Sequence, residues 1–241
     1  MSAVAVVGEV TLRALLGRRR AILVGLLALL PVAIALLIRL AGGRSDIVPI
    51  LDTLVVRTTL PLVALIIGTA AIGSEIEDGT LVYTLVKPVP RWHIALAKTL
   101  VAAGLTAILI VPPILVAAVL MAGFAGSTLS TAAGFALAAA IGGAAYAGAF
   151  TALGAVTSRA LLIGLAYTLL WEGVLAGLLE GTRYLSIRQA TLGLAAAATG
   201  GEVGVDPLGP GISAVIIITV VVGGFLITSR VLARFQVRSA D

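Results

Sequence analysis

The stretch from Thr99 to Gly123, TLVAAGLTAILIVPPILVAAVLMAG, contains no charged residue. A helix that crosses a bilayer needs roughly 20 consecutive apolar residues, so this stretch is long enough to span a membrane. The composition agrees, because 60% of the residues are hydrophobic and only 11% are charged, whereas soluble domains have roughly 25% charged residues. The sequence therefore predicts a membrane protein.

Five further stretches are apolar over a similar length. Their hydrophobicity is continuous, which indicates helices, because strands of a membrane barrel alternate apolar and polar residues over about ten positions. We expect an all-α polytopic membrane protein with six transmembrane helices in one transmembrane domain. The predicted spans are about 21–40, 55–73, 99–123, 130–157, 160–180 and 211–229, with a cytoplasmic segment at 74–98 and an outer segment at 181–210.

The residues before the first span, AVAVVGEVTLRALLG, have partial amphipathic character. Val7 and Thr11 lie near one helical face, and Glu9 and Arg13 lie near the other. This pattern favours an N-terminal amphipathic helix that lies in the membrane interface. A frayed tail is the alternative. The outer segment contains residues at helical spacing, from Tyr184 to Leu194, and we expect a short helix on the outer surface there.

The basic residues predict the orientation, because loops rich in Lys and Arg stay in the cytoplasm. With six spans, most of the basic residues fall on one side of the membrane. This predicts a protein of the cell membrane, inner or plasma, with both termini and segment 74–98 on its cytoplasmic side. The cytoplasmic set is Arg13, Arg18, Arg19, Arg20, Lys87, Arg91, Lys98, Arg159, Arg230, Arg234 and Arg238. The other side has Arg39, Arg44, Arg183 and Arg188, with Arg57 near its edge.

Several classes of chemistry lack the residues that they need. The chain has no cysteine, which excludes disulfides and thiolate metal sites, and His93 is its only histidine. There is no G-x-S-x-G elbow and no G-x-x-x-x-G-K-[ST] phosphate loop. No soluble domain is expected that could carry a basic face for nucleic acid. We therefore expect no catalytic residue, metal or cofactor in this chain.

The densest group of charges lies in GSEIEDGTLVYTLVKPVPRWHIALAK, Gly73 to Lys98. Ser74 is a candidate N-cap, and the acids after it would occupy the first turn of a short cytoplasmic helix. Prolines then end the regular structure. The alternative is a capped loop whose charges only face water. The acids are Glu75, Glu77 and Asp78, followed by Gly79, Thr80, Leu81, Leu85, Pro88 and Arg91.

This segment resembles a family pattern. Gly73, Glu75, Gly79, Thr80, Leu81, Pro88, Arg91 and Lys98 are similar to the G-x-E-x-x-x-G-T-L, P-x-x-R and trailing K of ABC-2 type transporter permeases. The resemblance implies a homodimer of permeases with separate ABC ATPase subunits, which bind the ATP and magnesium. It implies that the segment is a coupling helix that docks on the ATPase, and that export is the usual direction.

Glu172 lies near the middle of the fifth predicted span, where an ionised acid is costly unless it is paired or faces a cavity. It could line the substrate pathway or pair two helices, or it could form a purely structural hydrogen bond to a Tyr, Thr or Trp of another span. A secondary transporter or channel is the alternative function, and a lipid-modifying enzyme is a weaker one. An apolar pathway would suit lipids, drugs or hydrophobic peptides equally.

Overall fold

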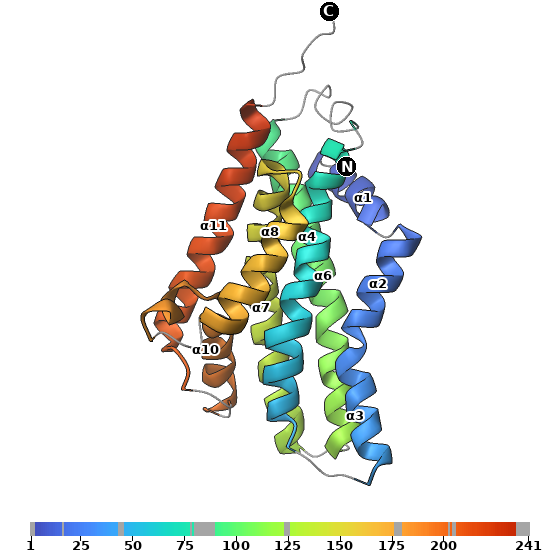
Figure 1. Cartoon of the computed structure of the whole chain (residues 1–241), viewed down its shortest axis with the longest axis vertical. Helices are drawn as coiled ribbons and strands as arrows, with labels where there is room; N and C mark the ends of the chain where they lie inside the picture. The colour runs from blue at the N-terminus through green and yellow to red at the C-terminus, as the bar shows by residue number, and fades with distance from the viewer. Residues whose placement is uncertain are drawn as a thin grey trace, which may run out of the picture.

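The computed structural model describes residues 3–15, 17–42, 46–77, 79, 90–122, 126–175, 180–201, 203 and 206–234 as a bundle of helices (Figure 1). None of these residues forms a strand, so the all-α prediction is confirmed. The elements are α1 (Ala3–Leu15), α2 (Arg18–Ala28), α3 (Leu30–Leu40), the π-helix η1 (Ile50–Thr59), α4 (Leu60–Glu77), α6 (Arg91–Ala122), α7 (Gly126–Val156), α8 (Ala160–Ala166), the π-helix η2 (Tyr167–Leu175), the 3-10 helix η3 (Glu180–Leu185), α10 (Ile187–Thr199) and α11 (Pro210–Arg234).

Four of the described helices are long and apolar enough to cross a membrane: Ile50–Ile76, Arg91–Met121, Gly126–Val156 and Pro210–Arg234. A fifth candidate consists of α2 and α3, which meet at an angle of 41°. Pro31 lies in the first turn of α3 and cannot donate a backbone hydrogen bond, which accounts for the break. The apolar helix Ala160–Leu175 is shorter than a span. The count of six spans therefore stays a prediction.

Helix α7 is the centre of the bundle and packs against α4, α6, α10 and α11. Glycines allow these close approaches. A side-chain carbon on Gly224 of α11 would lie 2.6 Å from the Gly148 carbonyl oxygen, and one on Gly154 would lie 2.7 Å from the Thr69 carbonyl oxygen of α4. The small-residue positions of α7 therefore serve packing inside one chain, as is common for membrane helices.

The bundle has two distinct ends. At one, which we call the α1 end, Val7, Ile72, Ile94, Ala155 and Leu232 form a buried apolar cluster that joins α1, α4, α6, α7 and α11. The N-terminus and the end of α11 both lie there (Figure 1). The opposite end, which we call the α3 end, contains the end of α3 and the start of α7 (Figure 1). Helix α1 is present, while its position in a membrane interface stays a prediction.

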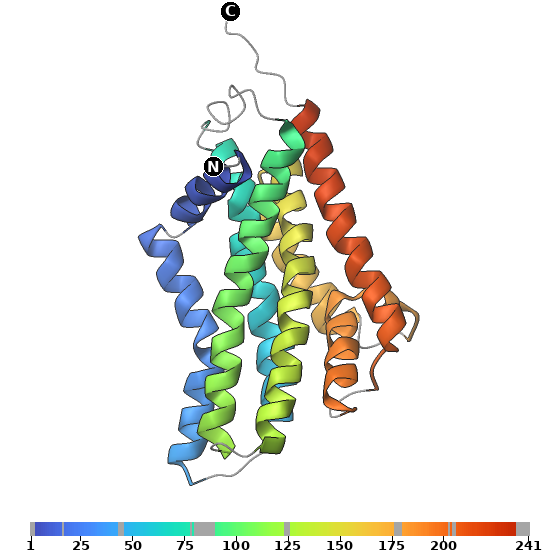
Figure 2. The ribbon, with the colours of Figure 1, turned by 180° about the vertical axis from the view of Figure 1, so that it is seen from behind.

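Helix α10 is more deeply buried than the sequence indicated. A helix was expected within 184–194, and α10 is present at Ile187–Thr199, packed against α7 and α11 with most of its residues buried. Figure 2 shows α10 beside α7 and α11. The Ser186 hydroxyl caps its start by accepting a hydrogen bond from the Gln189 backbone N–H at 3.1 Å. Gly142 and Gly193 have no side chain where Thr191 and Ser213 approach, so α10 fits tightly between its neighbours. Its location on the outer side of the membrane stays a prediction, whereas its burial in the bundle was not predicted, because it depends in part on Gly142, which is far away in the sequence.

Candidate functional site

The acidic end of α4 differs from the local structure that its sequence suggests. Helix α4 continues through Ser74 to Glu77, and the Ser74 hydroxyl donates to the Ala70 carbonyl oxygen at 2.6 Å. The predicted N-cap at Ser74 is therefore wrong, because its side chain bonds back into the helix that it belongs to. Glu75 and Glu77 lie in the last turn of α4, and the next described helix, α6, begins at Arg91.

Glu75 forms a largely buried ion pair with Lys98 of α6. The Lys98 Nζ lies 2.6 Å from Glu75 Oε1 and donates a second hydrogen bond, of 2.9 Å, to the Ala71 carbonyl oxygen. The Lys98 side chain is 0% exposed and that of Glu75 is 14% exposed. A buried ammonium group is tolerated only when such partners replace water. The pair therefore fastens the end of α4 to α6.

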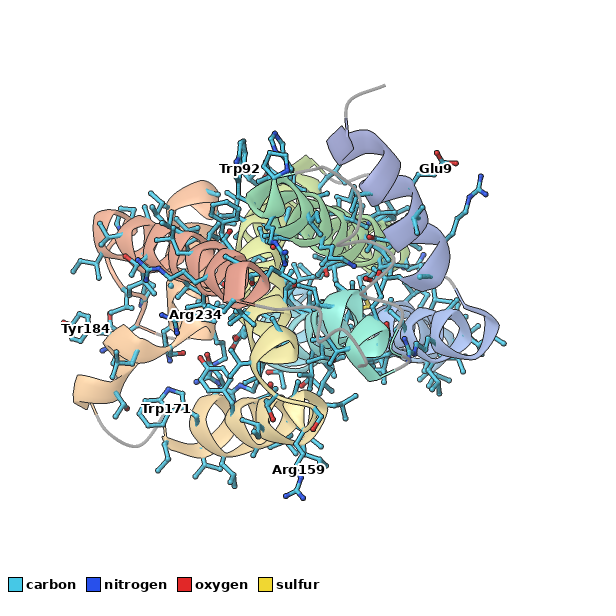
Figure 3. The ribbon with its side chains drawn as sticks, turned by 90° about the horizontal axis from the view of Figure 1, so that it is seen from above. Glu9, Trp92, Arg159, Trp171, Tyr184 and Arg234 are labelled. Carbon is cyan, nitrogen blue, oxygen red and sulfur yellow. The ribbon has the colours of Figure 1, made fainter. Side chains whose placement is uncertain are left out.

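Arg91 makes a second connection at the same end. Its guanidinium donates to the Leu232 carbonyl oxygen of α11 at 2.9 Å, which joins the first turn of α6 to the last turns of α11. Trp92, the next residue, is half exposed at the edge of the bundle (Figure 3). The chain therefore leaves α4 and re-enters α6 at two points that are each tied to the bundle.

The predicted coupling residues between these points lie mostly outside the described part of the chain. Asp78, Thr80, Leu81, Leu85 and Pro88 are among them. Gly79 is described and is exposed, with φ of +67°, a left-handed conformation that favours glycine. The backbone of Glu77 belongs to α4.

Glu172 holds the start of α10. Its side chain is buried, and it accepts hydrogen bonds from the Tyr167 hydroxyl at 2.8 Å, the Ile187 backbone N–H at 2.9 Å and the Ser186 hydroxyl. A carboxylate is favourable at a helix N-terminus, where backbone N–H groups lack partners within the helix. Glu172 therefore has structural hydrogen bonds, but its tyrosine partner belongs to the same apolar helix and not to another span as the sequence analysis expected.

A polar cluster that the sequence did not predict lies near Glu172. Asp52, Tyr146, Arg188 and Gln189 come from η1, α7 and α10, and all four are buried. Among the described residues, no hydrogen-bond partner reaches Asp52 Oδ1, the Tyr146 hydroxyl, Arg188 Nε and Nη1, or Gln189 Oε1. Burial, and next the neighbouring charge of Arg57, lowers the pKa of Arg188 from its ordinary value. The only sequence signal was the presence of Asp52 and Arg57 at the edge of an apolar run.

Both acids of this region lie on π-helices. Asp52 belongs to η1 and Glu172 to η2. In η1 the hydroxyls of Thr58 and Thr59 donate to the carbonyl oxygens of Thr53 and Leu54, five residues earlier, at 2.9 and 2.7 Å. Such wide turns are rare and occur frequently at functional sites. In this structure the π-helices η1 and η2 place Asp52 and Glu172 beside the same helix, α10.

Two cavities lie between the described helices, the first next to η2 and the second at the α1 end. An apolar cavity of about 490 Å³ lies between α7, η2 and α11, and Phe150, Tyr167, Ile187 and Val220 are among its lining residues. A second cavity, of about 340 Å³, lies at the α1 end and is lined by residues of α2, α4 and α8 and by the α7–α8 connection. The described residues contain no group of His, Asp and Glu that could hold a metal ion.

Comparison with known protein families matches residues 16–182 to the family described as "ABC-2 family transporter protein". The matched region runs from the start of α2 through η2, and it includes both the Glu75–Lys98 pair and Glu172. No curated protein sequence matches the chain.

Proposed function

Because the chain belongs to the ABC-2 transporter family, we propose that it is the permease subunit of an ATP-binding cassette exporter. The members of this family are membrane subunits that are not themselves catalytic. In the proposed complex, two copies of this chain form a homodimer, and a separate ATPase subunit binds the ATP and magnesium. The apolar helices and the family match support this assignment.

We infer that the α1 end lies on the cytoplasmic side of the cell membrane. Basic residues concentrate at helix ends there, and positively charged segments are retained on the cytoplasmic side. Both termini would then be cytoplasmic. At the α1 end the described basic residues include Arg20, Arg91, Arg159, Arg230 and Arg234. The described basic residues assigned to the other side are Arg39, Arg183 and Arg188, with Arg57 near that edge.

The segment between Glu77 and Pro90 would contact the ATPase. The observation that carries this proposal is the buried Glu75–Lys98 pair, which joins the helices on either side of the segment. A displacement of the segment would therefore move α4 and α6 together. The bond from Arg91 to Leu232 would carry the same displacement to α11.

The predicted coupling residues then divide into two groups. Glu75 and Arg91 would act inside the permease, as fasteners of the segment to the bundle. The direct contacts with the ATPase would come from Glu77, Asp78, Gly79, Thr80, Leu81, Leu85 and Pro88. Glu172 would pair η2 with α10, because the described donors around it already satisfy its carboxylate.

Reversing the charges of Glu77 and Asp78 together tests this assignment. Loss of a charged partner at an interface weakens binding by roughly 2 to 5 kcal/mol, which exceeds a tenfold change in affinity. Glu77→Lys/Asp78→Lys should therefore lower co-elution with the ATPase by more than about tenfold, while the permease stays folded. Reversal of Glu202, in the predicted outer segment, is the control. Unchanged co-elution and transport would mean that these acids only face water.

A further inference from the structure

The cavity at the α1 end has a charged rim and an apolar wall. It lies between α2, α4 and α8, with the α7–α8 connection on one side; α2 and α8 flank α4 when the bundle is seen from above (Figure 3). Arg20, Thr157 and Ser158 lie at its rim, and Thr69 and Ser74 of α4 are the other polar residues of its lining. Its volume, about 340 Å³, falls in the range of small-molecule sites, roughly 300 to 1,000 Å³.

The apolar part of the lining extends from the rim into the predicted membrane region. Leu23 of α2 and Leu161 of α8 line the cavity, and they are 63% and 50% exposed. Arg20 lies one turn before Leu23, at the point where the apolar run of α2 begins. Polar groups thus lie directly above exposed aliphatic side chains, which matches a phospholipid with its headgroup at the rim and its acyl chains below.

Arg20 is available to an anionic ligand. It is exposed, and no hydrogen bond or ion pair joins it to another described residue. A guanidinium can donate two parallel hydrogen bonds to a phosphate, which makes arginine well suited to this group. Basic pockets between membrane helices on the cytoplasmic side bind anionic headgroups. We propose that this cavity binds the headgroup of an anionic phospholipid from the leaflet at the α1 end.

Such a lipid would contact the end of α4. Gly73 and Ser74 line the cavity and directly precede Glu75, which fastens α4 to α6. The lipid would therefore support the last turn of α4, from which the segment at 78–89 continues. This regulatory role rests on the proposed function of that segment, whereas lipid binding itself does not.

Lipid retention by the purified full-length chain tests the proposal. The protein is incubated with equal amounts of phosphatidylglycerol and phosphatidylcholine in mixed micelles and washed, and the retained lipids are quantified by mass spectrometry. The native chain should retain phosphatidylglycerol preferentially. One basic residue near the surface contributes about fivefold to anionic-lipid affinity, so Arg20→Glu should lower this preference by more than about fivefold. Arg20→Lys should keep most of it.

Two further variants separate the cavity from general charge effects. Ser158→Glu places a negative charge at the exposed rim and should lower phosphatidylglycerol retention even if Arg20→Glu does not fold. Arg39→Glu, at the α3 end on an equally exposed side chain, should leave retention unchanged.

Three results would overturn the proposal. The first is equal phosphatidylglycerol retention by Arg20→Glu and Arg20→Lys. The second is a loss of retention in Arg39→Glu as large as that in Arg20→Glu. The third is displacement of the lipid by inorganic phosphate at similar concentration, which would indicate a site for free phosphate. The assay contains no ATPase, so failure of lipid binding leaves the proposed function standing. Conversely, normal lipid retention with no ATPase association would contradict the proposed function alone.

Discussion

Two buried groups of charges lie in different parts of this bundle and differ in how completely their polar atoms are paired. At the α1 end, Lys98 is wholly buried and bonds both to Glu75 and to the Ala71 carbonyl oxygen. Toward the α3 end, Arg188 is 2% exposed, yet its Nε and Nη1 have no partner among the described residues. Asp52, the nearby acid of η1, also has an unpartnered oxygen.

This difference indicates different mechanical roles. Breaking a buried ion pair by removing one partner is strongly unfavourable, so α4 and α6 should move as one unit at the α1 end. A buried polar group without a partner already carries an unfavourable desolvation energy, so a rearrangement that pairs it is inexpensive. We therefore expect a rigid connection at the α1 end and an adaptable one around Asp52 and Arg188.

The largest expected effect comes from removing the buried ammonium group. Lys98→Met removes the ion pair with Glu75, and loss of one side of a buried pair destabilises proteins by about 3 to 5 kcal/mol. Because Glu75 keeps some contact with water, we expect the lower part of that range. Thermal unfolding in detergent measures the change. Arg13→Met is the matched control, since its pair with Glu9 is exposed and should contribute less than about 1 kcal/mol. Equal losses of stability in the two variants would mean that the buried Lys98 pair contributes no more than the exposed Arg13 pair.

A smaller effect is expected at Glu172. Glu172→Ala leaves the Ser186 hydroxyl and the Ile187 N–H without their acceptor. Because the shorter side chain leaves room for water, we expect the lower end of the range for an unsatisfied group, about 1 kcal/mol each. The start of α10 should loosen, which hydrogen exchange of its amides would detect as reduced protection. Tyr184→Ala, on an exposed side chain of η3, is the control. If transport falls while α10 keeps its protection, Glu172 lines the pathway instead.

The smallest expected effect is at Arg188. Among the described residues, no hydrogen-bond partner reaches two of the three guanidinium nitrogens of Arg188, so an apolar residue of similar length loses few hydrogen bonds and removes an unfavourable desolvation energy. We expect Arg188→Met to change the free energy of unfolding by less than about 1 kcal/mol, measured by the same thermal assay as Lys98→Met. A loss as large as that of Lys98→Met would show that both ends are equally dependent on their charges, and the comparison would fail.

The sequence predicted the helices well because continuous hydrophobicity depends only on local composition. The runs that contain α4, α6, α7 and α11 were all located in this way. The family pattern also marked Glu75 and Lys98, although it did not show that they contact each other. The hydrophobic pattern of the sequence does not reveal that Glu75 and Lys98, which are 23 positions apart, form an ion pair.

The missed features depend on contacts between distant segments. Arg188 was assigned to the outer side from the six-span topology, and the helix of α10 was predicted from the helical spacing between Tyr184 and Leu194; neither signal indicated burial. Arg188 and most of α10 are buried because α10 packs against α7 and α11. Ser74 was taken for a cap because its hydroxyl can bond either to the following turn or back to Ala70, and local sequence does not decide between them.

The central claim is that Glu75 transmits motion inside the permease and does not contact the ATPase directly. The most direct measurement is transport and ATPase co-elution by Glu75→Gln, a change that removes the charge but keeps the shape. We expect co-elution within about twofold of the native chain, because the interface is intact. We expect transport per ATP hydrolysed to fall at least about tenfold, corresponding to about 1.4 kcal/mol of lost coupling. Loss of co-elution, or transport at the native level, would contradict the account.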